Sequence, residues 1–372
     1  MPKRALCFTL CLALCAALLA GCTQPAGSAP GSAAADPELA GLQRFTTSWF
    51  DVFDTVTTVI GYAGSQEEWN AQMEALHADL AEYHKLYDIY LDYSGVVNLR
   101  GVNAAAGQGP VQVDARIIDL LAEAKEMYGV TGGKMNVAFG TVLKVWHNYR
   151  EQALDDPAQA AVPTREELEA AARHCDIEDL VLDAEAGTVA FADPQLLLDV
   201  GSVGKGYAVE MVARAARERG LKSALISVGG NLRSIGHKPD GTRWTGGIQN
   251  PWTTSSESIV PQEDPYLCAV EVEDMALVTS GNYQRYYELD GKRYHHLIDP
   301  DTLMPADQFA AVAVLAPDSG IADCLSTGLF CMSREEGRQL VESMDGVEAM
   351  WMLGENEIVY SSGFEGYIRQ AQ

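Results

Sequence analysis

A carboxylate and a hydroxyl lie four residues apart in segment 322–327 (ADCLST), at Asp323 and Thr327. The apolar residues around them predict a helix, and residues four apart share one helix face. Carboxylate and hydroxyl oxygens are suitable ligands for Mg²⁺. The pair is therefore a candidate magnesium site, although a solvated Asp and a Thr bonded to its own helix would leave the same pattern.

Segment 199–207 (DVGSVGKGY) joins a predicted strand to a predicted helix and carries Asp199, three glycines and Lys205. Free backbone N–H groups and a cation at such a turn suit a phosphate. The spacing is neither a Walker motif nor G-x-G-x-x-G, so a plain tight turn is the other interpretation. A glycine pair in segment 227–231 (SVGGN) also follows a predicted strand and would permit close approach of a ligand.

Segment 294–300 (YHHLIDP) places two histidines and Asp299 at the end of a predicted hairpin strand. A histidine at this position could act as an acid–base group near neutral pH. Neighbouring residues of a strand point to opposite faces, so at most one of His295 and His296 is expected to face a given site. A purely structural histidine is the alternative.

A mixture of helices and strands must position these segments. Alternation, β-branched runs and an Asp-Gly turn predict strands or hairpins over 50–61, 180–191, 223–228, 283–298, 310–315, 347–353 and 356–361. Spacing and capping residues predict helices beginning after Ser65, Asp114 and Thr164, and over 202–220, 319–332 and 333–344. The polar stretch 252–265 is predicted to be a surface loop. No linker divides the chain after residue 45, so we expect one compact α+β body over 45–368.

The composition excludes some classes of protein. Of 372 residues, 47% are hydrophobic and 21% are charged, which is enough apolar material for a core. Lys and Arg total 26 against 52 Asp and Glu, a formal net charge of -26. Nucleic acid is therefore not an expected partner, and charge alone would not hold the chain on anionic lipid.

The N-terminus has the pattern of a bacterial lipoprotein signal. Lys3 and Arg4 precede an apolar run over 5–20, and the run ends in a lipobox-like Leu-Ala-Gly before Cys22. We expect residues 1–21 to be a signal peptide, Cys22 to be lipidated, and 22–44, rich in Ala, Pro, Gly and Ser, to be a flexible tether. An ordinary signal peptide with a chance cysteine is the alternative. The body would then lie outside the cytoplasmic membrane, attached to it by lipid only.

Four cysteines lie outside the signal and anchor, and none forms a C-x-x-C pair, so no zinc site is expected. They are Cys175, Cys268, Cys324 and Cys331. The last two fall in an apolar helical run and are predicted to be small core residues.

Six segments in order along the chain resemble the motifs of the ApbE family of flavin transferases, which move FMN from FAD onto a protein threonine. They are 199–207 (DVGSVGKGY), 227–231 (SVGGN), 244–251 (WTGGIQNP), 279–283 (TSGNY), 296–300 (HLIDP) and 322–327 (ADCLST). The resemblance covers about residues 45–365 and implies the family's fold, an α+β domain of the T-fold-like type.

The resemblance also implies a role for each matched residue. Asp323 and Thr327 would bind Mg²⁺ with the backbone carbonyl of Ser202, and His296 and Lys205 would be the catalytic base and cation. Contacts to FAD would come from Lys205 and from residues at the family's flavin-binding positions. These are Phe53, Tyr90, Lys134, Met135, Asn136, Asp199 and Asp299.

The chain departs from the family pattern in two segments. Phe53-Asp54-Thr55 stands where the family usually has Met-Gly-Thr, and 135–138 (MNVA) stands where it has Phe-Asp-Pro-Thr. Both segments are at flavin-contact positions, so the orientation of the flavin is left open.

These features predict a Mg²⁺-dependent FAD:protein FMN transferase. The resemblance implies that its acceptors are exported flavoproteins, such as subunits of Rnf or Nqr type redox complexes. The absence of a nucleophile elbow (G-x-S-x-G) agrees with a nucleophile that belongs to the acceptor. One alternative is a Mg²⁺-dependent FAD pyrophosphatase that releases FMN and AMP. Another is a lipoprotein that binds FAD without chemistry. A solute-binding lipoprotein would need two similar lobes, and the sequence has no such duplication.

Overall fold

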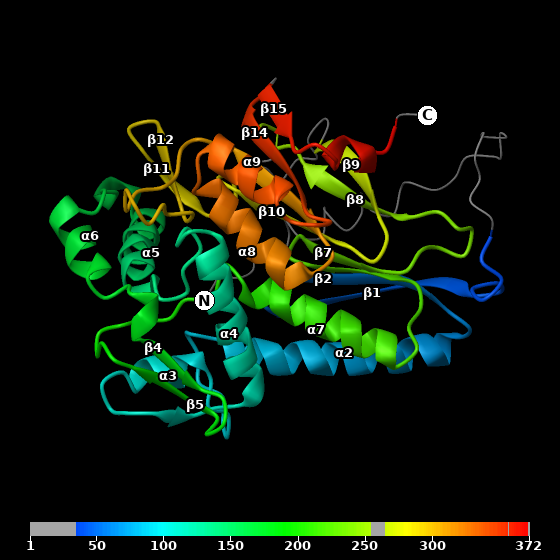
Figure 1. Ribbon diagram of the computed structural model, residues 1–372, viewed down its shortest axis with the longest axis horizontal. Helices are drawn as coiled ribbons and strands as arrows, with labels where there is room; N and C mark the ends of the chain where they lie inside the picture. The colour runs from blue at the N-terminus through cyan, green and yellow to red at the C-terminus, as the bar shows by residue number, and fades with distance from the viewer. Residues whose placement is uncertain (1–34, 254–264, 356, 371–372) are drawn as a thin grey trace.

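The computed structural model describes residues 35–253, 265–355 and 357–370, and its centre is an antiparallel sheet of eight strands (Figure 1). The strand order is β1-β2-β6-β7-β10-β13-β14-β15. The bounds are β1 Gln43–Val52, β2 Thr55–Ala63, β6 Ala224–Val228, β7 Asn231–Ile235, β10 Ala276–Gly281, β13 Ala311–Ala316, β14 Glu348–Gly354 and β15 Glu357–Tyr360.

Strand β13 explains why the sheet is covered on both faces. All six of its residues are buried. Val312, Val314 and Ala316 join one apolar cluster, while residues 311, 313 and 315 join another on the opposite face. Side chains alternate across a strand, so a continuous apolar run needs cover above and below.

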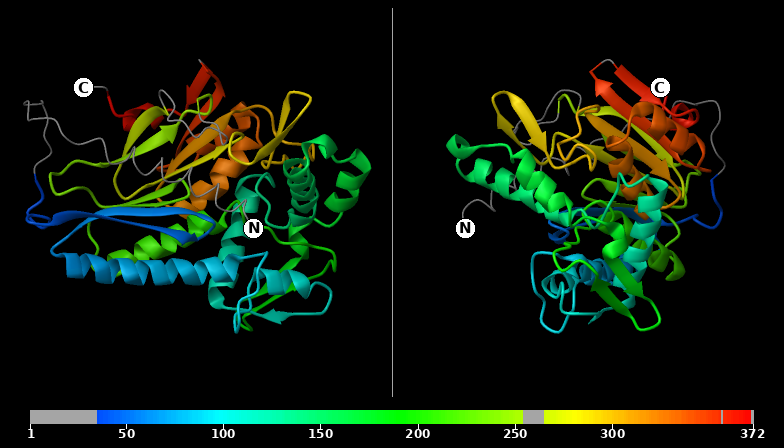
Figure 2. Two further views of the ribbon diagram at one scale, coloured as in Figure 1. Left: turned by 180° about the vertical axis from the view of Figure 1, so that it is seen from behind. Right: turned by 60° about the vertical axis from the view of Figure 1, so that its left-hand side comes forward.

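Four helices cover one face of this sheet. Under β1, β2 and β6 lie α2 (Gln66–Tyr87) and α7 (Gly204–Glu218), which pack on each other and run side by side in the left view of Figure 2. Next to them, α8 (Ser319–Phe330) packs on β10 and β13, with α9 (Arg334–Glu342) beside β14. The opposite face is covered by a hairpin of β8 (Trp244–Gln249) and β9 (Tyr266–Val272), together with the short helix η3 (Phe364–Tyr367).

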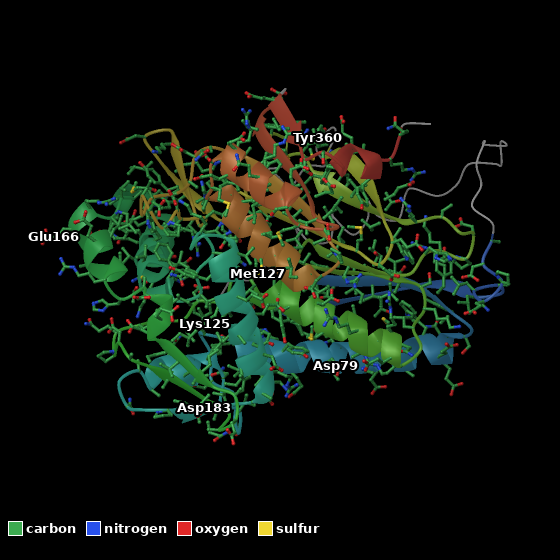
Figure 3. All side chains as sticks on the ribbon, viewed as in Figure 1. Asp79, Lys125, Met127, Glu166, Asp183 and Tyr360 are labelled. Atoms are coloured by element: carbon green, nitrogen blue, oxygen red, sulfur yellow. The ribbon has the colours of Figure 1, made fainter. Side chains whose placement is uncertain are left out.

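A second region extends the helical side of the molecule. It holds α3 (Leu99–Ala104), α4 (Ala115–Val130), α5 (Gly140–Asp155), α6 (Arg165–Ala172), the turns η1 (Pro157–Gln159) and η2 (Ile177–Asp179), and the small sheet β3 (Val111–Gln112), β5 (Thr188–Phe191), β4 (Leu180–Asp183). Lys125 of α4 donates to the carbonyl groups of Ile177 and Leu180 and so ties this sheet to α4 (Figure 3). The hairpin β11 (Tyr286–Leu289) and β12 (Lys292–His295) packs on α5.

Most predicted elements are confirmed, including the single α+β body. The caps explain the helix starts: Ser65, Asp114 and Thr164 each accept a hydrogen bond from a backbone N–H of the first turn. Cys324 and Cys331 are buried, as predicted, and all four described cysteines are free. Most of the loop predicted over 252–265 lies outside the described residues. Within the described ranges, none of the helices has the combined length and apolarity that a bilayer crossing requires.

The prediction of a single strand over 50–61 is wrong. The chain turns back at Phe53 and Asp54, which separate β1 from β2 and have φ values of 54° and 50°. Two consecutive residues with positive φ make a tight hairpin turn, and such turns usually contain Asn-Gly or Asp-Gly. Because Phe-Asp is not such a turn sequence, the β-branched residues on both sides of it predict one continuous strand.

The predicted tether is too long at its C-terminal end. Residues 36–44 pack on the body: Leu39 is buried, the Asp36 N–H donates to the Pro239 carbonyl, and β1 begins at Gln43. The apolar side chain of Leu39 anchors this segment, which has no Ser and a single Gly, whereas the preceding residues are rich in both. The predicted signal peptide, Cys22 and the tether up to residue 34 lie outside the described residues.

A buried ion pair fixes α7 against the sheet and against α8. The Glu210 and Arg233 side chains are only 2% and 9% exposed, and Arg233 Nε lies 2.6 Å from Glu210 Oε2. The same carboxylate accepts from Arg214 and from the Ser319 N–H at the start of α8. Glu210 therefore connects α7, β7 and the first turn of α8, one turn before Asp323.

Replacement of Arg233 by Met should lower the free energy of unfolding by about 3–5 kcal/mol, because it leaves Glu210 buried with one half-exposed partner. Denaturant unfolding would measure the loss. Arg219→Met is the matched control: Arg219 pairs with Asp79 at the surface, so it should cost less than about 1 kcal/mol. Equal losses in the two variants would contradict this assignment.

Gly206 allows α7 and α8 to touch. A Cβ at this position would lie 2.3 Å from the Ser319 carbonyl oxygen and 2.4 Å from Asp323 Cβ. Both distances are shorter than any real Cβ contact, and neither neighbour is the flexible end of a side chain. The glycine thus brings the residue next to it, Lys205, alongside Asp323.

Gly206→Ala should therefore destabilise the protein by about 1–3 kcal/mol, as overpacking does. Gly129→Ala in α4 is the control, because a Cβ there meets nothing within 4 Å and Ala favours a helix by about 0.5–1 kcal/mol. The two variants should shift the unfolding midpoint in opposite directions. A neutral Gly206→Ala would show that the helices can separate at no cost.

Candidate functional site

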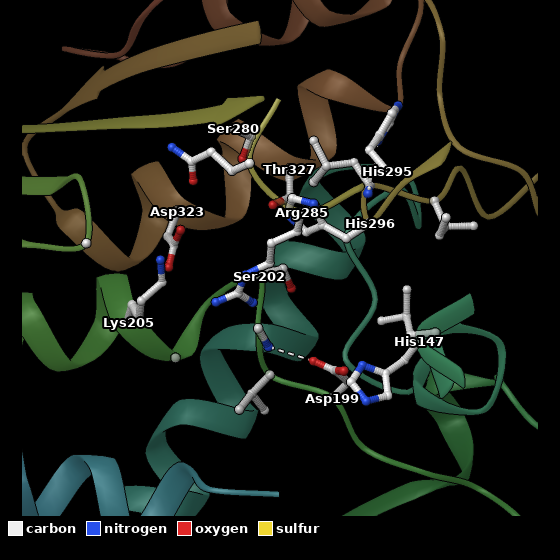
Figure 4. Close-up of a pocket in the computed structure, with 18 of the residues that line it drawn as sticks. His147, Asp199, Ser202, Lys205, Ser280, Arg285, His295, His296, Asp323 and Thr327 are labelled. Atoms are coloured by element: carbon white, nitrogen blue, oxygen red, sulfur yellow. Dashed lines mark hydrogen bonds between the residues drawn. The ribbon is translucent and has the colours of Figure 1, made fainter. Parts of the chain in front are cut away.

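A cavity of about 390 Å³ collects the segments that carry the candidate residues (Figure 4). Its wall is formed by the tip of the β1–β2 hairpin, the loop after α2, α5, the first turn of α7, the end of β10, the segment after β12 and α8. The lining residues extend from Phe53 to Thr327. The fold therefore brings together side chains that lie more than 270 positions apart.

Asp323 and Thr327 line this cavity from α8, with Ser202 facing them from the turn before α7. Asp323 is only 5% exposed, and its Oδ2 accepts from the Gly206 N–H at 2.8 Å. Burial raises the pKa of Asp323, against the opposing effects of Lys205, the Gly206 amide and Asn231. A nearly dry carboxylate gains most from a cation, so this donor set fits Mg²⁺.

The metal would have to be held chiefly by uncharged oxygens. In the described part of the chain, no group of three or more His, Cys, Asp or Glu residues could hold a metal ion. A site built on Asp323, the Thr327 hydroxyl and the Ser202 carbonyl has one protein carboxylate only. Mg²⁺ commonly binds with so few carboxylates when phosphate groups of a substrate complete its coordination.

Lys205 has no carboxylate partner within ion-pair distance among the residues that the structure describes. Burial lowers the pKa of Lys205, and the charge of Asp323 opposes this shift without being within ion-pair distance. Since an unpaired buried ammonium is costly, a Lys205 that faces a cavity is suited to an anionic ligand.

Of the two histidines, only His296 is free for chemistry. His295 donates from Nε2 to the Ala306 carbonyl and accepts the Leu297 N–H at Nδ1, so it is a neutral structural residue. The Nδ1 of His296 is buried and has no hydrogen-bond partner in the described parts of the chain. Burial, with the charge of Arg285 next in size, lowers the pKa of His296 well below its ordinary value. His296 is therefore a neutral base that lines the cavity.

Several predicted flavin contacts also reach the cavity. Phe53, Tyr90, Lys134 and Asn136 line it, as does Asp199. Tyr90 is 62% exposed and its ring lies 5.9 Å from that of His147, so one face is open to a planar ligand. Burial raises the pKa of Asp199, whose Oδ1 accepts from the Gly201 N–H. Asn136 is already bonded to the Cys175 carbonyl and the Ala138 N–H, so it also shapes the wall.

Two predicted contacts do not line the cavity. Met135 is fully buried in the core, so its side chain supports the wall from behind. Asp299 forms an ion pair with Lys134, 2.7 Å from its Nζ, and Asp301 binds the same ammonium. Asp299 thus orients Lys134 and does not itself face the cavity.

Sequence reasoning missed four basic residues of this site, one of which is His84 in the last turn of α2. Arg285 precedes β11, and His147 and Arg150 lie on α5, a helix that was not predicted. Phe139 caps α5 without a side-chain hydrogen bond, so the usual start signal is absent. The only available signal was the spacing of His147 and Arg150, three apart on one helix face. Arg150 donates to His147 Nδ1, and burial lowers the pKa of His147.

Comparisons with known proteins identify the family of this chain. The model of the ApbE family matches residues 53–351. A FAD:protein FMN transferase of Treponema pallidum is 32% identical, with 73% of this chain and 75% of that protein covered. One of Klebsiella pneumoniae is 28% identical, with 78% and 85% covered.

Solved structures show the same fold. The ApbE protein of Thermotoga maritima has a TM-score of 0.74 at 25% identity, with 88% of this chain and all of that chain covered. The flavin transferase ApbE of Vibrio cholerae has a TM-score of 0.70 at 25% identity, with 88% and 99% covered. The family model spans most of this chain, so the protein belongs to the ApbE family.

Proposed function

We propose that this protein is a FAD:protein FMN transferase that attaches FMN to a threonine of an acceptor protein and releases AMP. The observation that carries the proposal is the cavity itself, which gathers a free base, an unpaired cation and a buried carboxylate. Relatives that carry this name over most of their length support it.

The reaction needs little beyond these groups. The threonine Oγ forms a bond to the FMN phosphorus, and the bond from that phosphorus to the bridging oxygen breaks, so that AMP leaves with the oxygen. His296 accepts the hydroxyl proton, a role worth about 10²–10⁴-fold in rate. Lys205 neutralises charge on the pyrophosphate, and Arg285 and Arg150 add positive potential at the same cavity. The nucleophile comes from the acceptor.

Mg²⁺ would be held by Asp323, Thr327 and the carbonyl of Ser202, and when bound it would stabilise negative charge on the phosphates. Asp323 is held for this role by the Gly206 N–H. Lys205 lies in the first turn of α7, which packs against α8 at Asp323, so both charges would approach the pyrophosphate from one side of the cavity.

We propose further that Cys22 is lipidated and that the body works outside the cytoplasmic membrane. The lipobox-like sequence before Cys22 supports this location. Acceptors would then be exported flavoproteins, of which Rnf and Nqr type subunits are examples. Labelling with a radioactive fatty acid, lost in Cys22→Ser, would test the anchor.

The central experiment incubates the protein with FAD, Mg²⁺ and an acceptor domain of Rnf or Nqr type, and follows acceptor mass. An added FMN on a threonine supports the proposal, and Asp323→Asn should abolish it because the variant lacks the only carboxylate of the metal site. Asp345→Asn, an exposed acid outside the cavity, should keep full activity. Full activity in Asp323→Asn would remove the metal assignment.

Other products would identify the alternatives. FMN and AMP without acceptor labelling would indicate a pyrophosphatase with water as nucleophile. Tight FAD binding with no product in the presence of several acceptors would indicate a binding lipoprotein.

The lowered pKa of His296 predicts the pH profile. Because the folded protein keeps this imidazole neutral below its ordinary pKa of 6.5, kcat/KM should be flat from pH 7.5 to 6.5 and fall only at lower pH. His296→Gln should lose about 10²–10⁴-fold in kcat and lose that acid limb. His237→Gln, a surface control that pairs with Asp36 and Glu273, should change neither. An unchanged acid limb in His296→Gln would assign the base elsewhere.

A further inference from the structure

The tip of the β1–β2 hairpin is an unusual wall for a binding cavity. Phe53 and Asp54 both line the cavity and both have positive φ, although neither is glycine. Such conformations cost on the order of 1 kcal/mol or more for a residue with a side chain, and they persist only where the surroundings hold them. Glycine would adopt the φ of Asp54 without strain, and Asp54 has a side chain.

His84 holds this tip. It lies in the last turn of α2, and its Nδ1 accepts the Phe53 N–H at 3.1 Å. The Phe53 ring packs edge-on against the imidazole, with 5.5 Å between centroids. An imidazole that accepts at Nδ1 carries its proton on Nε2.

The same imidazole also reaches the loop that carries Tyr90. His84 Nε2 lies 3.1 Å from the Tyr93 hydroxyl, which in turn donates to Asp88 Oδ2 at 2.8 Å. The other oxygen of Asp88 accepts the N–H groups of Tyr90 and Leu91. Burial and the bond to Asp88 raise the pKa of Tyr93 to about 12, so this hydroxyl keeps its proton.

These hydrogen bonds form one continuous series, which runs from the Phe53 amide through His84, Tyr93 and Asp88 to the Tyr90 amide. Both ends line the cavity, Phe53 from the hairpin tip and Tyr90 from the loop after α2. Hydrogen bonds in such networks fix the relative position of the segments they join. In this series of hydrogen bonds, His84 is the residue that bonds both to the hairpin and to Tyr93.

We propose that His84 is a positioning residue for FAD: it sets the hairpin tip and the Tyr90 loop at the separation that FAD requires. Its bond to the Phe53 N–H restrains the turn in which Phe53 and Asp54 both have positive φ. The inference rests on the proposed function, because it assumes that FAD occupies this cavity.

The test measures the FAD dissociation constant by flavin fluorescence, together with kcat for transfer. His84→Leu removes both bonds and should raise the dissociation constant about tenfold, with a smaller change in kcat, since one or two net hydrogen bonds are worth roughly that factor. His84→Asn keeps an acceptor near the Nδ1 position and should stay within about threefold of wild type. His77→Leu is the control, because His77 lies on the same helix and pairs with Asp51 of the same hairpin but does not line the cavity.

A second substitution in the His84→Leu background distinguishes a loss of FAD positioning from a loss of protein stability. Asp54→Gly relieves the positive φ, so it should restore most of the FAD affinity that His84→Leu loses. Tyr93→Phe should weaken binding about as much as His84→Leu, and the double variant should be no worse than either, because both break the same series of hydrogen bonds.

Each result decides one question. If wild-type protein does not bind FAD, the proposed function fails and the inference fails with it. If wild type binds FAD and His84→Leu binds within twofold of it, the inference alone is overturned. If His84→Leu does not fold, Tyr93→Phe decides: unchanged affinity overturns the inference, and a tenfold loss supports it.

Discussion

The close contact of α7 with α8 at Gly206 is the constraint on which the site depends. Only a residue without Cβ lets the Asp323 side chain and the Ser319 carbonyl approach the first turn of α7. The Gly206 N–H then donates to the Asp323 carboxylate, and Lys205 lies close enough for its charge to act on that carboxylate. The Glu210–Arg233 pair holds the same two helices one turn away.

A site of this kind needs charges that are not neutralised by one another. Lys205 has no carboxylate within ion-pair distance among the described residues, and Asp323 is held by a backbone amide and not by a cation. By contrast, Lys134 and Arg233 are satisfied by Asp299 and Glu210. The strong net negative charge of the chain therefore says little about its cavity, where four Lys and Arg side chains stand against four Asp side chains.

Much of the site could be predicted from sequence because its residues lie in short segments at the ends of regular elements. The spacing of Asp323 and Thr327 is enough to predict that they share a helix face, and the glycines before α7 indicate a tight turn. Prediction failed where no local signal existed. α5 begins without a capping side chain, so His147 and Arg150 were missed, and the hairpin turn at Phe53-Asp54 lacks turn residues.

The sequence by itself determined the element types, the helix caps, the choice of candidate residues and, through six ordered motifs, the family. Those features depend on spacing of a few residues, which local geometry converts directly into structure. Only the tertiary structure decided which histidine is free, that Met135 and Asp299 stand behind the cavity wall, and that His84 joins Phe53 to Tyr93. These facts depend on contacts between residues far apart in the chain, and such contacts exist only after the sheet and its helices have packed.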